Sequence, residues 1–335
     1  MKAVVYGLRP DEIPLLERET NALRSKGYDL EIDTTPEYLT KDTASLAAGA
    51  NAVLIVAACK ITEEVAAELE KAGVRYVLTR STGYDQIGQE AIKRHGLRAA
   101  NVPVYSMNAV PEFTILMMLA LVRNWKAMER KFKAQDFTLQ EIQGKELGSM
   151  TLGLFGTGTL GIRTASMLHA MGCRILASSP HEKDEAKEYV TYTSQEEVFR
   201  QSDLLFFHCV LNDSTRQMVN RETIAQMKDG VYLVNTARGG LIDFEAVLEA
   251  LKSGKIAGFA SDVYDKEAQF IRKDLTGQEI QDPVLAELLG REDVILTPHV
   301  AFFTETSVSN LIRTALENFI EFETTGECER EVYKD

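Results

Sequence analysis

Three polar residues that could act together on a small organic acid follow predicted strands in the second half of the chain. They are Arg238, Glu267 and His299. A guanidinium can bind a carboxylate through two parallel hydrogen bonds, and an imidazole can exchange a proton with a carbinol oxygen near neutral pH. A carboxylate beside that imidazole would orient it and favour its protonated form. Each residue alone could be a surface ion pair, a solvated acid or a helix cap, but together at strand ends they predict acid–base chemistry.

A glycine-rich turn upstream of these residues predicts a dinucleotide site. The apolar run that begins at Leu152 leads into Gly156-Thr-Gly158-Thr-Leu-Gly161, and a helical pattern follows over Ile162–Met171. Such glycines allow a tight turn and a close approach of the backbone to a pyrophosphate, whose charge then faces the helix N-terminus. A glycine turn without a ligand is the alternative, but the flanking strand and helix favour the dinucleotide.

The strand predicted after this turn, Cys173–Ala177, does not end in the acid that usually binds the adenosine ribose. Ser179 stands there instead, and the nearest acids, Glu182 and Asp184, lie beyond the expected position. A carboxylate would repel a 2′-phosphate, whereas serine would not. The sequence therefore leaves both NAD and NADP open as the cofactor.

Short apolar runs that alternate with helical patterns predict the elements that position these residues. Such alternation is typical of parallel sheets covered by helices on both faces, with the ligand site at the carboxyl ends of the strands. The predicted fold class is α/β, with two doubly wound, Rossmann-like parallel-sheet domains. Strands are expected at Ala3–Tyr6, Val53–Val56, Tyr76–Leu78, Leu152–Phe155, Arg174–Ala177, Leu204–Phe207, Val231–Asn235, Ile256–Phe259 and Val294–Leu296, and helices at Thr62–Ala72, Asn108–Lys131 and Glu305–Thr325.

Bulk composition excludes several other classes of protein. The chain has 335 residues and a formal net charge of −13, with no basic run, so nucleic acid is not an expected partner. No stretch is long and apolar enough to predict a signal peptide or a membrane span, and a cytoplasmic location is expected. The four cysteines have neither a C-x-x-C pair nor the spacing of metal ligands, and no metal is predicted. They are Cys59, Cys173, Cys209 and Cys328.

Several segments together resemble the D-isomer-specific 2-hydroxyacid dehydrogenases, most closely the D-lactate dehydrogenase branch. They occur in the family's order and cover nearly the whole chain. The matching segments are Thr79-Arg-Ser-Thr-Gly-Tyr-Asp85, Asn101-Val-Pro-Val-Tyr-Ser106, the glycine turn, Asn235-Thr-Ala-Arg-Gly239, Asp262-Val-Tyr-Asp-Lys-Glu267 and Thr297-Pro-His-Val-Ala-Phe-Phe303. The resemblance implies a discontinuous substrate domain (1–102 and 301–335), a dinucleotide domain (103–300) and a cleft between them. It also implies a homodimer, with the helix after Asn108 at the interface.

The resemblance further implies catalytic roles for individual residues. His299 would be the general acid in ketone reduction and the base in the reverse direction, Glu267 would hold its other ring nitrogen, and Arg238 would bind the substrate carboxylate. The implied substrate contacts are the backbone amides of Thr82 and Gly83 and the aromatic walls Tyr105 and Phe302.

Cofactor contacts are implied in the same way. The pyrophosphate would lie at Gly156, Gly158, Thr159, Leu160 and Gly161, the adenosine and its ribose at Ser179, Cys209, Val210 and Thr215, and the nicotinamide at Thr236, Ala237 and Asp262. For Asp262, a structural role in capping a turn is the alternative.

The segment around Ser179 departs from the family pattern. Relatives with a serine at this position have an arginine next to it and resemble NADP users, whereas Pro180 stands there in this chain. His181 or Lys183 could supply the missing positive charge. We therefore expect only a modest cofactor preference, within about tenfold either way.

Among possible substrates, pyruvate and D-lactate are favoured. A larger 2-oxo acid, such as 2-oxoisocaproate, phenylpyruvate or 2-oxoglutarate, is the first alternative, although Met107 and Phe302 predict an apolar pocket that disfavours a second carboxylate. The second alternative is an NAD-sensing corepressor, because some relatives have that role. This chain lacks long extensions for docking partners and keeps the full acid–base set, which favours an enzyme.

Overall fold

The computed structural model describes residues 1–334, which form two compact units. One unit, here called the terminal unit, joins Met1–Ser106 to the segment that begins at Phe303. The other, the central unit, is Met107–Phe302. The predicted division at 102/103 and 300/301 lies a few residues from these boundaries.

The terminal unit contains a sheet with the strand order β13-β5-β4-β3-β1-β2. All neighbouring pairs are parallel except β13 and β5, which are antiparallel. The strands are β1 (Lys2–Val5), β2 (Glu31–Thr34), β3 (Ala52–Ile55), β4 (Tyr76–Thr79), β5 (Arg98–Ala100) and β13 (Glu331–Val332). The helices are α1 (Ile13–Arg24), α2 (Glu63–Lys71), α3 (Gln89–Arg94) and α11 (Glu305–Thr325), with short 3₁₀ turns η1 (Pro10–Glu12) and η2 (Ala44–Ala47).

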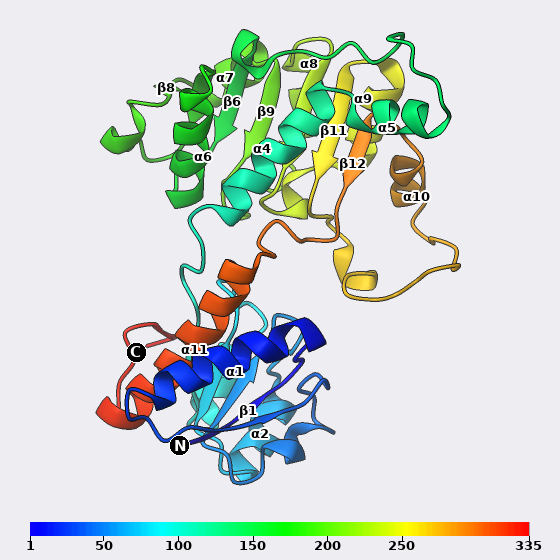
Figure 1. The fold of residues 1–335 in the computed structure, drawn as a ribbon. Coiled ribbons are helices and arrows are strands. Elements are labelled where there is room, and N and C mark those ends of the chain that lie inside the picture. Colours follow the sequence, from blue (N-terminus) through cyan, green and yellow to red (C-terminus); the bar gives the residue numbers. More distant parts are fainter. Residues whose placement is uncertain (335) are drawn as a thin grey trace. The chain divides into compact units, whose positions relative to one another are not determined.

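Helices cover both faces of this sheet (Figure 1). Helices α1 and α11 pack against each other, and α11 packs on β4, while the buried cluster shared by α2, α3 and η2 lies against strands β1, β3 and β4. The ends of two helices follow from local chemistry. The Thr62 side chain caps α2 by accepting from the amide of Val65, and α11 ends at Gly326, whose φ of 77° suits a residue without a side chain.

The central unit contains a parallel sheet with the order β12-β11-β10-β9-β6-β7-β8. The strands are β6 (Thr151–Phe155), β7 (Arg174–Ser178), β8 (Thr191–Tyr192), β9 (Leu204–Phe207), β10 (Val231–Asn235), β11 (Ile256–Ser261) and β12 (Val294–Leu296). The strand order reverses direction between β6 and β9. In a doubly wound sheet, this switch point is where ligands bind.

Helices also cover both faces of the central sheet. One buried cluster joins α4 (Ala109–Val122) and α6 (Thr159–Ala170) to the sheet. The other joins α7 (Gln195–Gln201), α8 (Arg221–Gln226), α9 (Phe244–Ser253) and α10 (Pro283–Leu289). The remaining elements are α5 (Trp125–Lys133) and the 3₁₀ turns η3 (Leu147–Ser149), η4 (Asp184–Ala186), η5 (Gly239–Leu241) and η6 (Glu267–Gln269). The prediction of two doubly wound α/β domains is confirmed.

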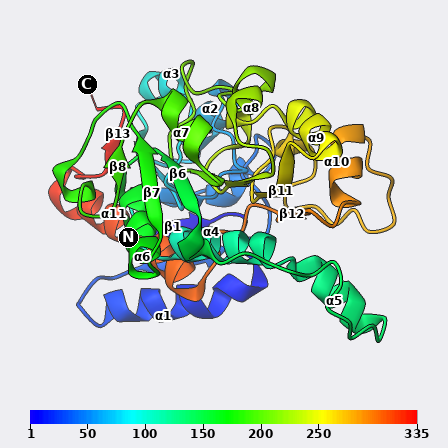
Figure 2. The ribbon, with the colours of Figure 1, turned by 90° about the horizontal axis from the view of Figure 1, so that it is seen from above.

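The single long helix predicted over Asn108–Lys131 is wrong. Helix α4 ends at Val122, and Asn124 has a φ of 51°, which turns the chain before α5 begins at Trp125. Most of α4 is apolar and buried. Helix α5 begins beside the sheet, where the Lys126 side chain donates to the Val294 carbonyl of β12, and then extends away from it (Figure 2). The helical spacing of apolar residues continues across Asn124, so the sequence pattern gave no sign that this left-handed residue ends the helix.

Within residues 1–334, no helix combines the length and the hydrophobicity that crossing a bilayer requires.

Candidate active site

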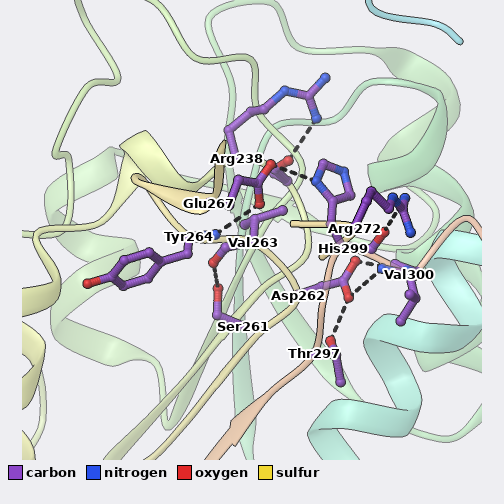
Figure 3. Close-up of polar contacts among 12 residues, drawn as sticks. Arg238, Ser261, Asp262, Val263, Tyr264, Glu267, Arg272, Thr297, His299 and Val300 are labelled. Atoms are coloured by element: carbon purple, nitrogen blue, oxygen red, sulfur yellow. Dashed lines mark hydrogen bonds and ion pairs between the residues drawn. The ribbon is translucent and has the colours of Figure 1, made fainter. Parts of the chain in front are cut away.

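The centre of the candidate site is an imidazole–carboxylate pair in the central unit (Figure 3). The Nδ1 atom of His299 lies 2.8 Å from Oε1 of Glu267, and the two side chains are 34% and 27% exposed. A carboxylate only accepts hydrogen bonds, so we assign Nδ1 as the donor. This contact leaves Nε2 of His299 as the ring nitrogen that can exchange a proton with a substrate.

Asp262 holds the segment that carries His299. This carboxyl group is 1% exposed, and its oxygens accept from the hydroxyl of Thr297 and from the amides of Val300 and Ala301. Burial raises the pKa of Asp262, and these hydrogen bonds oppose that rise. The contacts match the turn-capping alternative; the predicted nicotinamide contact remains a prediction.

The backbone of His299 is itself in an uncommon conformation. Its φ is 56°, in the left-handed region that costs a side-chain-bearing residue about 1–3 kcal/mol. The amide of His299 donates to the backbone carbonyl of Asp262 at 2.8 Å. The hydrogen bonds to Asp262 therefore hold the imidazole in a position that the chain alone would not favour.

Positive groups keep Glu267 ionised. Burial would raise the pKa of this carboxyl, but the hydrogen bond from His299, the amide of Tyr264 and the nearby Arg238 guanidinium outweigh burial and lower it. Arg238 is exposed and follows β10, where Asn235 shapes the turn by donating to the Arg238 carbonyl and accepting from the amide of Ala237. The structure thus brings Arg238, Glu267 and His299 to one edge of the central sheet.

Arg272 also lies beside the catalytic segment and was not foreseen from the sequence. Its guanidinium donates to the backbone carbonyl of His299 at 3.3 Å and lies 5.6 Å from the centre of the Phe302 ring. Arg272 comes from the loop after η6, five residues beyond the end of the motif that contains Glu267, and no local pattern in that loop identified it.

The glycine turn has the geometry that a pyrophosphate requires. Gly156 has a φ of 95°, and a Cβ there would lie 2.8 Å from the amide nitrogen of Cys209. A Cβ on Gly161 would lie 2.1 Å from the carbonyl oxygen of Gly156, whereas Gly158 faces open space. The first and third glycines are therefore needed for packing, and the second leaves room for a ligand. These residues fit a bound dinucleotide.

His208 packs against the glycine turn and was also missed as a functional residue in the sequence analysis. Its ring lies 2.9 Å from the hydroxyl of Thr164, which donates to the carbonyl of Leu160. Burial lowers the pKa of His208 to about 4, so the ring is neutral near pH 7. Because the Thr164 hydroxyl donates its one proton to Leu160, we assign Nε2 of His208 as the donor to Thr164. Its place directly after a buried strand, opposite the glycine turn, was the available clue.

The other predicted cofactor residues lie at the carboxyl ends of the central strands. Thr159 and Leu160 begin α6, Ser179 follows β7, and Cys209 and Val210 follow β9. The Thr215 hydroxyl donates to the Val210 carbonyl and thereby closes the loop after β9. The nicotinamide candidates Thr236 and Ala237 follow β10, and the Thr236 hydroxyl lies 2.7 Å from that of Thr114 on α4.

The predicted substrate amides lie in the terminal unit, in the loop after β4. The Asn101 side chain donates to the Thr82 carbonyl at 2.7 Å, and the Ser81 hydroxyl donates to the Gly83 carbonyl at 2.6 Å. Gln86 in turn donates to the hydroxyl of Thr79, which lies against that of Ser81. The Ser81 carbonyl, which shares its peptide with the Thr82 amide, accepts from the amide of Val102 at 3.1 Å. With the Ser81 and Thr82 carbonyls both held, the loop can present the amides of Thr82 and Gly83, on the opposite side of those peptides, to an anion.

The two predicted aromatic walls belong to different units. Tyr105 is half-buried in the terminal unit, where its carbonyl accepts from Asn310, and Phe302 closes the central unit. The supporting residues Ser81, Asn101 and Asn235 were missed as functional residues. Each lies within a quoted motif at the end of a strand, where Asn and Ser commonly shape turns, and that position was the usable clue.

Comparisons with known proteins agree with this geometry. Residues 115–301 match the family model described as D-isomer specific 2-hydroxyacid dehydrogenase, NAD binding domain. The chain is 36% identical to an aromatic 2-oxoacid reductase of Clostridium sporogenes, covering 99% of both chains, and 34% identical to a D-lactate dehydrogenase of Lactiplantibacillus plantarum, covering 100% of both.

Two solved structures share the whole fold. The crystal structure of a D-lactate dehydrogenase from Treponema pallidum superposes with a TM-score of 0.91 at 35% identity, covering 99% of each chain. The structure of a D-2-hydroxyisocaproate dehydrogenase gives a TM-score of 0.92 at 32% identity, covering 100% of each. The chain therefore belongs to the D-isomer-specific 2-hydroxyacid dehydrogenase family, and it is an NAD-dependent oxidoreductase.

Proposed function

We propose that this enzyme interconverts pyruvate and D-lactate. The observation that carries the proposal is the His299–Glu267 pair, 2.8 Å apart at the carboxyl ends of parallel strands, with Nε2 available for proton exchange. D-lactate dehydrogenases of Treponema pallidum and Lactiplantibacillus plantarum are among its relatives, at 36% and 34% identity.

Each residue has a defined part in this reaction. When bound, NADH supplies the hydride. His299 donates a proton from Nε2 to the 2-oxo oxygen of pyruvate, and it removes that proton in the reverse direction. Glu267 stabilises the imidazolium form, and Asp262 keeps the ring in place. Arg238 and the amides of Thr82 and Gly83 bind the substrate carboxylate.

A matrix of 2-oxo acids with NADH, followed by loss of absorbance, tests the substrate. We expect pyruvate to have the highest kcat/KM and the product to be D-lactate. A highest kcat/KM for another acid would reject pyruvate as the substrate. Turnover of none of the acids would reject the whole proposal.

The second candidate is a larger 2-oxo acid such as phenylpyruvate or 2-oxoisocaproate. Its support is the 36% identity to an aromatic 2-oxoacid reductase and the fold shared with a D-2-hydroxyisocaproate dehydrogenase. The same matrix separates the two candidates, because an aromatic substrate would show a lower KM for phenylpyruvate than for pyruvate.

Arg238→Lys tests the carboxylate anchor. Lysine keeps the positive charge but loses the planar fork that binds two oxygens. We expect a higher KM for the 2-oxo acid together with a lower kcat, because the guanidinium both binds and orients. An unchanged KM would remove Arg238 from the substrate site.

For the cofactor, we propose that NADH and NADPH are both accepted, with kcat/KM values within about tenfold of each other. The support is Ser179, which replaces the acid that would repel a 2′-phosphate. Ser179→Asp should shift the enzyme strongly toward NADH. A wild-type ratio beyond about a hundredfold would show that another residue decides.

We also propose a homodimer formed through α4, α5 and the loop after them. Large apolar side chains are exposed there, with Trp125 at 59%, Phe132 at 71% and Leu139 at 83%. Exposed apolar surface of this kind is typical of an interface between subunits. Light scattering should give the mass of two chains, and Phe132→Glu should give that of one.

A further inference from the structure

A tyrosine at the edge of the central sheet ties together two parts of the cofactor site. The hydroxyl of Tyr192, on β8, donates to the hydroxyl of Thr157 at 2.8 Å and accepts from the amide of Lys183 at 3.0 Å. Thr157 is 1% exposed and lies between the first two glycines of the turn. One side chain thus bridges the pyrophosphate turn and the segment that follows Ser179.

The bridged segment, 179–183, comes directly after β7, at the position that normally binds the adenosine ribose. Because the bridge bonds the backbone of Lys183, it fixes the course of the segment whatever side chains the segment carries. It therefore bears on the choice between a ribose hydroxyl and a 2′-phosphate.

The charges of the segment argue against a 2′-phosphate in this conformation. Residues 181–188 carry four acids and two lysines. Both lysines already pair with acids, Lys183 with Glu185 at 3.8 Å and Lys187 with Asp184 at 2.8 Å. A 2′-phosphate would have to take its cation from one of these ion pairs or from His181, and the bridge restrains the backbone that would have to move.

We propose that Tyr192 is a positioning residue that biases the nicotinamide cofactor preference toward NADH, within the roughly tenfold range proposed above, by holding the 179–183 segment in a form that favours NADH over NADPH. The proposal rests on the placement of Ser179 beside the adenosine ribose. It adds a cause that the side chain of Ser179 does not supply. Releasing the bridge should weaken NADH binding and leave NADPH binding equal or stronger.

Tyr192→Phe removes both hydrogen bonds and keeps the ring. The experiment measures dissociation constants for NADH and NADPH by fluorescence, with no substrate present, alongside the melting temperature. We expect NADH to bind about tenfold more weakly, a change of about 1.4 kcal/mol, because both hydrogen bonds that fix the segment are lost. The ratio of the NADPH to the NADH dissociation constant should fall by a similar factor. Thr157→Val, which removes one of the two bonds, should give a smaller change in the same direction.

Tyr189→Phe is the matched control. Tyr189 lies three residues upstream, where its ring packs edge-on against His169 at 5.8 Å. This variant should leave both dissociation constants unchanged. If Tyr192→Phe weakens the two cofactors equally, or lowers only the melting temperature, Tyr192 has a merely structural role and the proposal fails.

Ser179→Asp separates this failure from that of the proposed cofactor site. If Ser179→Asp shifts the preference toward NADH and Tyr192→Phe does not alter the ratio, the ribose site stands and the role of Tyr192 is rejected. If Ser179→Asp has no effect either, the segment does not face the ribose, and both ideas are rejected.

Discussion

Within residues 1–334, each unit has a histidine paired with carboxylates, and the two histidines differ in which ring nitrogens are engaged. In the central unit, Glu267 engages Nδ1 of His299 at 2.8 Å. In the terminal unit, Glu70 engages Nδ1 of His95 at 2.7 Å, and Glu63 engages Nε2 at 3.0 Å. The distances are nearly equal, but both nitrogens of His95 are occupied.

Pairing with a carboxylate alone does not make a histidine a proton donor. What distinguishes His299 from His95 is the number of its ring nitrogens that are already engaged and the place of the side chain in the fold. His95 ends α3 and links it to two carboxylates on α2, with 15% of its side chain exposed. His299 is more exposed, at 34%, and lies with Arg238 at the carboxyl ends of the strands of the central unit, which also carries the glycine turn. A close carboxylate stabilises an imidazolium in either place. A proton can be delivered only where a ring nitrogen faces a substrate.

The largest expected effect comes from His299→Gln. Glutamine can still bond to Glu267 but cannot transfer a proton, so kcat should fall by about 10²–10⁴-fold. Binding of NADH, measured by fluorescence, should be unchanged. Near-normal turnover would mean that His299 is no more catalytic than His95.

Glu267→Gln should lower kcat by about tenfold to a hundredfold, because a hydrogen bond to a charged group is worth about 1.5–3 kcal/mol. The pKa of Glu267 lies below its ordinary value, so the carboxylate stays charged as the pH rises above that range. Its loss removes the acceptor that orients Nδ1 of His299. Because protonation of Glu267 would remove the same acceptor, kcat/KM of the wild type should fall as the pH drops through the lowered pKa of Glu267. Glu267→Gln should lack this acidic limb, and an acidic limb that is unchanged in the variant would argue against the pairing.

Asp262→Asn should have a smaller effect, about tenfold in kcat/KM, equivalent to about 1.4 kcal/mol. The amides of Val300 and Ala301 donate to different oxygens of Asp262, and asparagine keeps only one accepting oxygen, so one of these amides loses its acceptor and the His299 segment loses part of its support. The melting temperature shows whether the fold survives. A stable variant with full activity would separate the Asp262 contacts from catalysis.

His95→Gln should change kcat/KM by less than about twofold, as surface substitutions usually have little effect. We expect this substitution to lower the free energy of unfolding instead, by an amount that depends on pH. The hydrogen bond to Glu70 raises the pKa of His95, and the contact with Glu63 raises it further, whereas partial desolvation lowers it. Glu63 is also paired with Arg94. A raised pKa stabilises the fold below the ordinary value of 6.5 and loses that contribution as pH rises through the folded value.

The difference in melting temperature between wild type and His95→Gln should therefore be larger near about pH 6 than near about pH 9. Calorimetry at the two pH values measures it. A difference that grows with pH would contradict the stabilising role of the contacts that His95 makes with Glu63 and Glu70.

Much of the fold could be predicted because a buried parallel strand appears in the sequence as a short continuous run of apolar residues. The runs Leu204–Phe207, Val231–Asn235 and Val294–Leu296 became strands with the predicted bounds, and Glu305–Thr325 became one helix. Strands β2, β5, β8 and β13 were not predicted. The side chains of β2, β8 and β13 are exposed or half-buried, so these short strands lack a continuous apolar run. Strand β5 is only Arg98-Ala-Ala100, which is too short and too poor in large apolar side chains to give that signal.

The catalytic residue types and their positions after strands are local properties, so Arg238, Glu267 and His299 could be named from the printed chain. The supporting contacts are not local. Asp262 holds residues 35 to 39 positions away, Asn101 reaches back 19 positions to Thr82, and Tyr192 reaches 35 positions to Thr157. Hydrogen bonds depend on distance and direction between atoms. Those distances and directions arise only when packed strands bring distant segments to one edge of a sheet. The tertiary structure therefore decides that His299 keeps one ring nitrogen for a substrate, whereas both ring nitrogens of His95 are engaged by carboxylates.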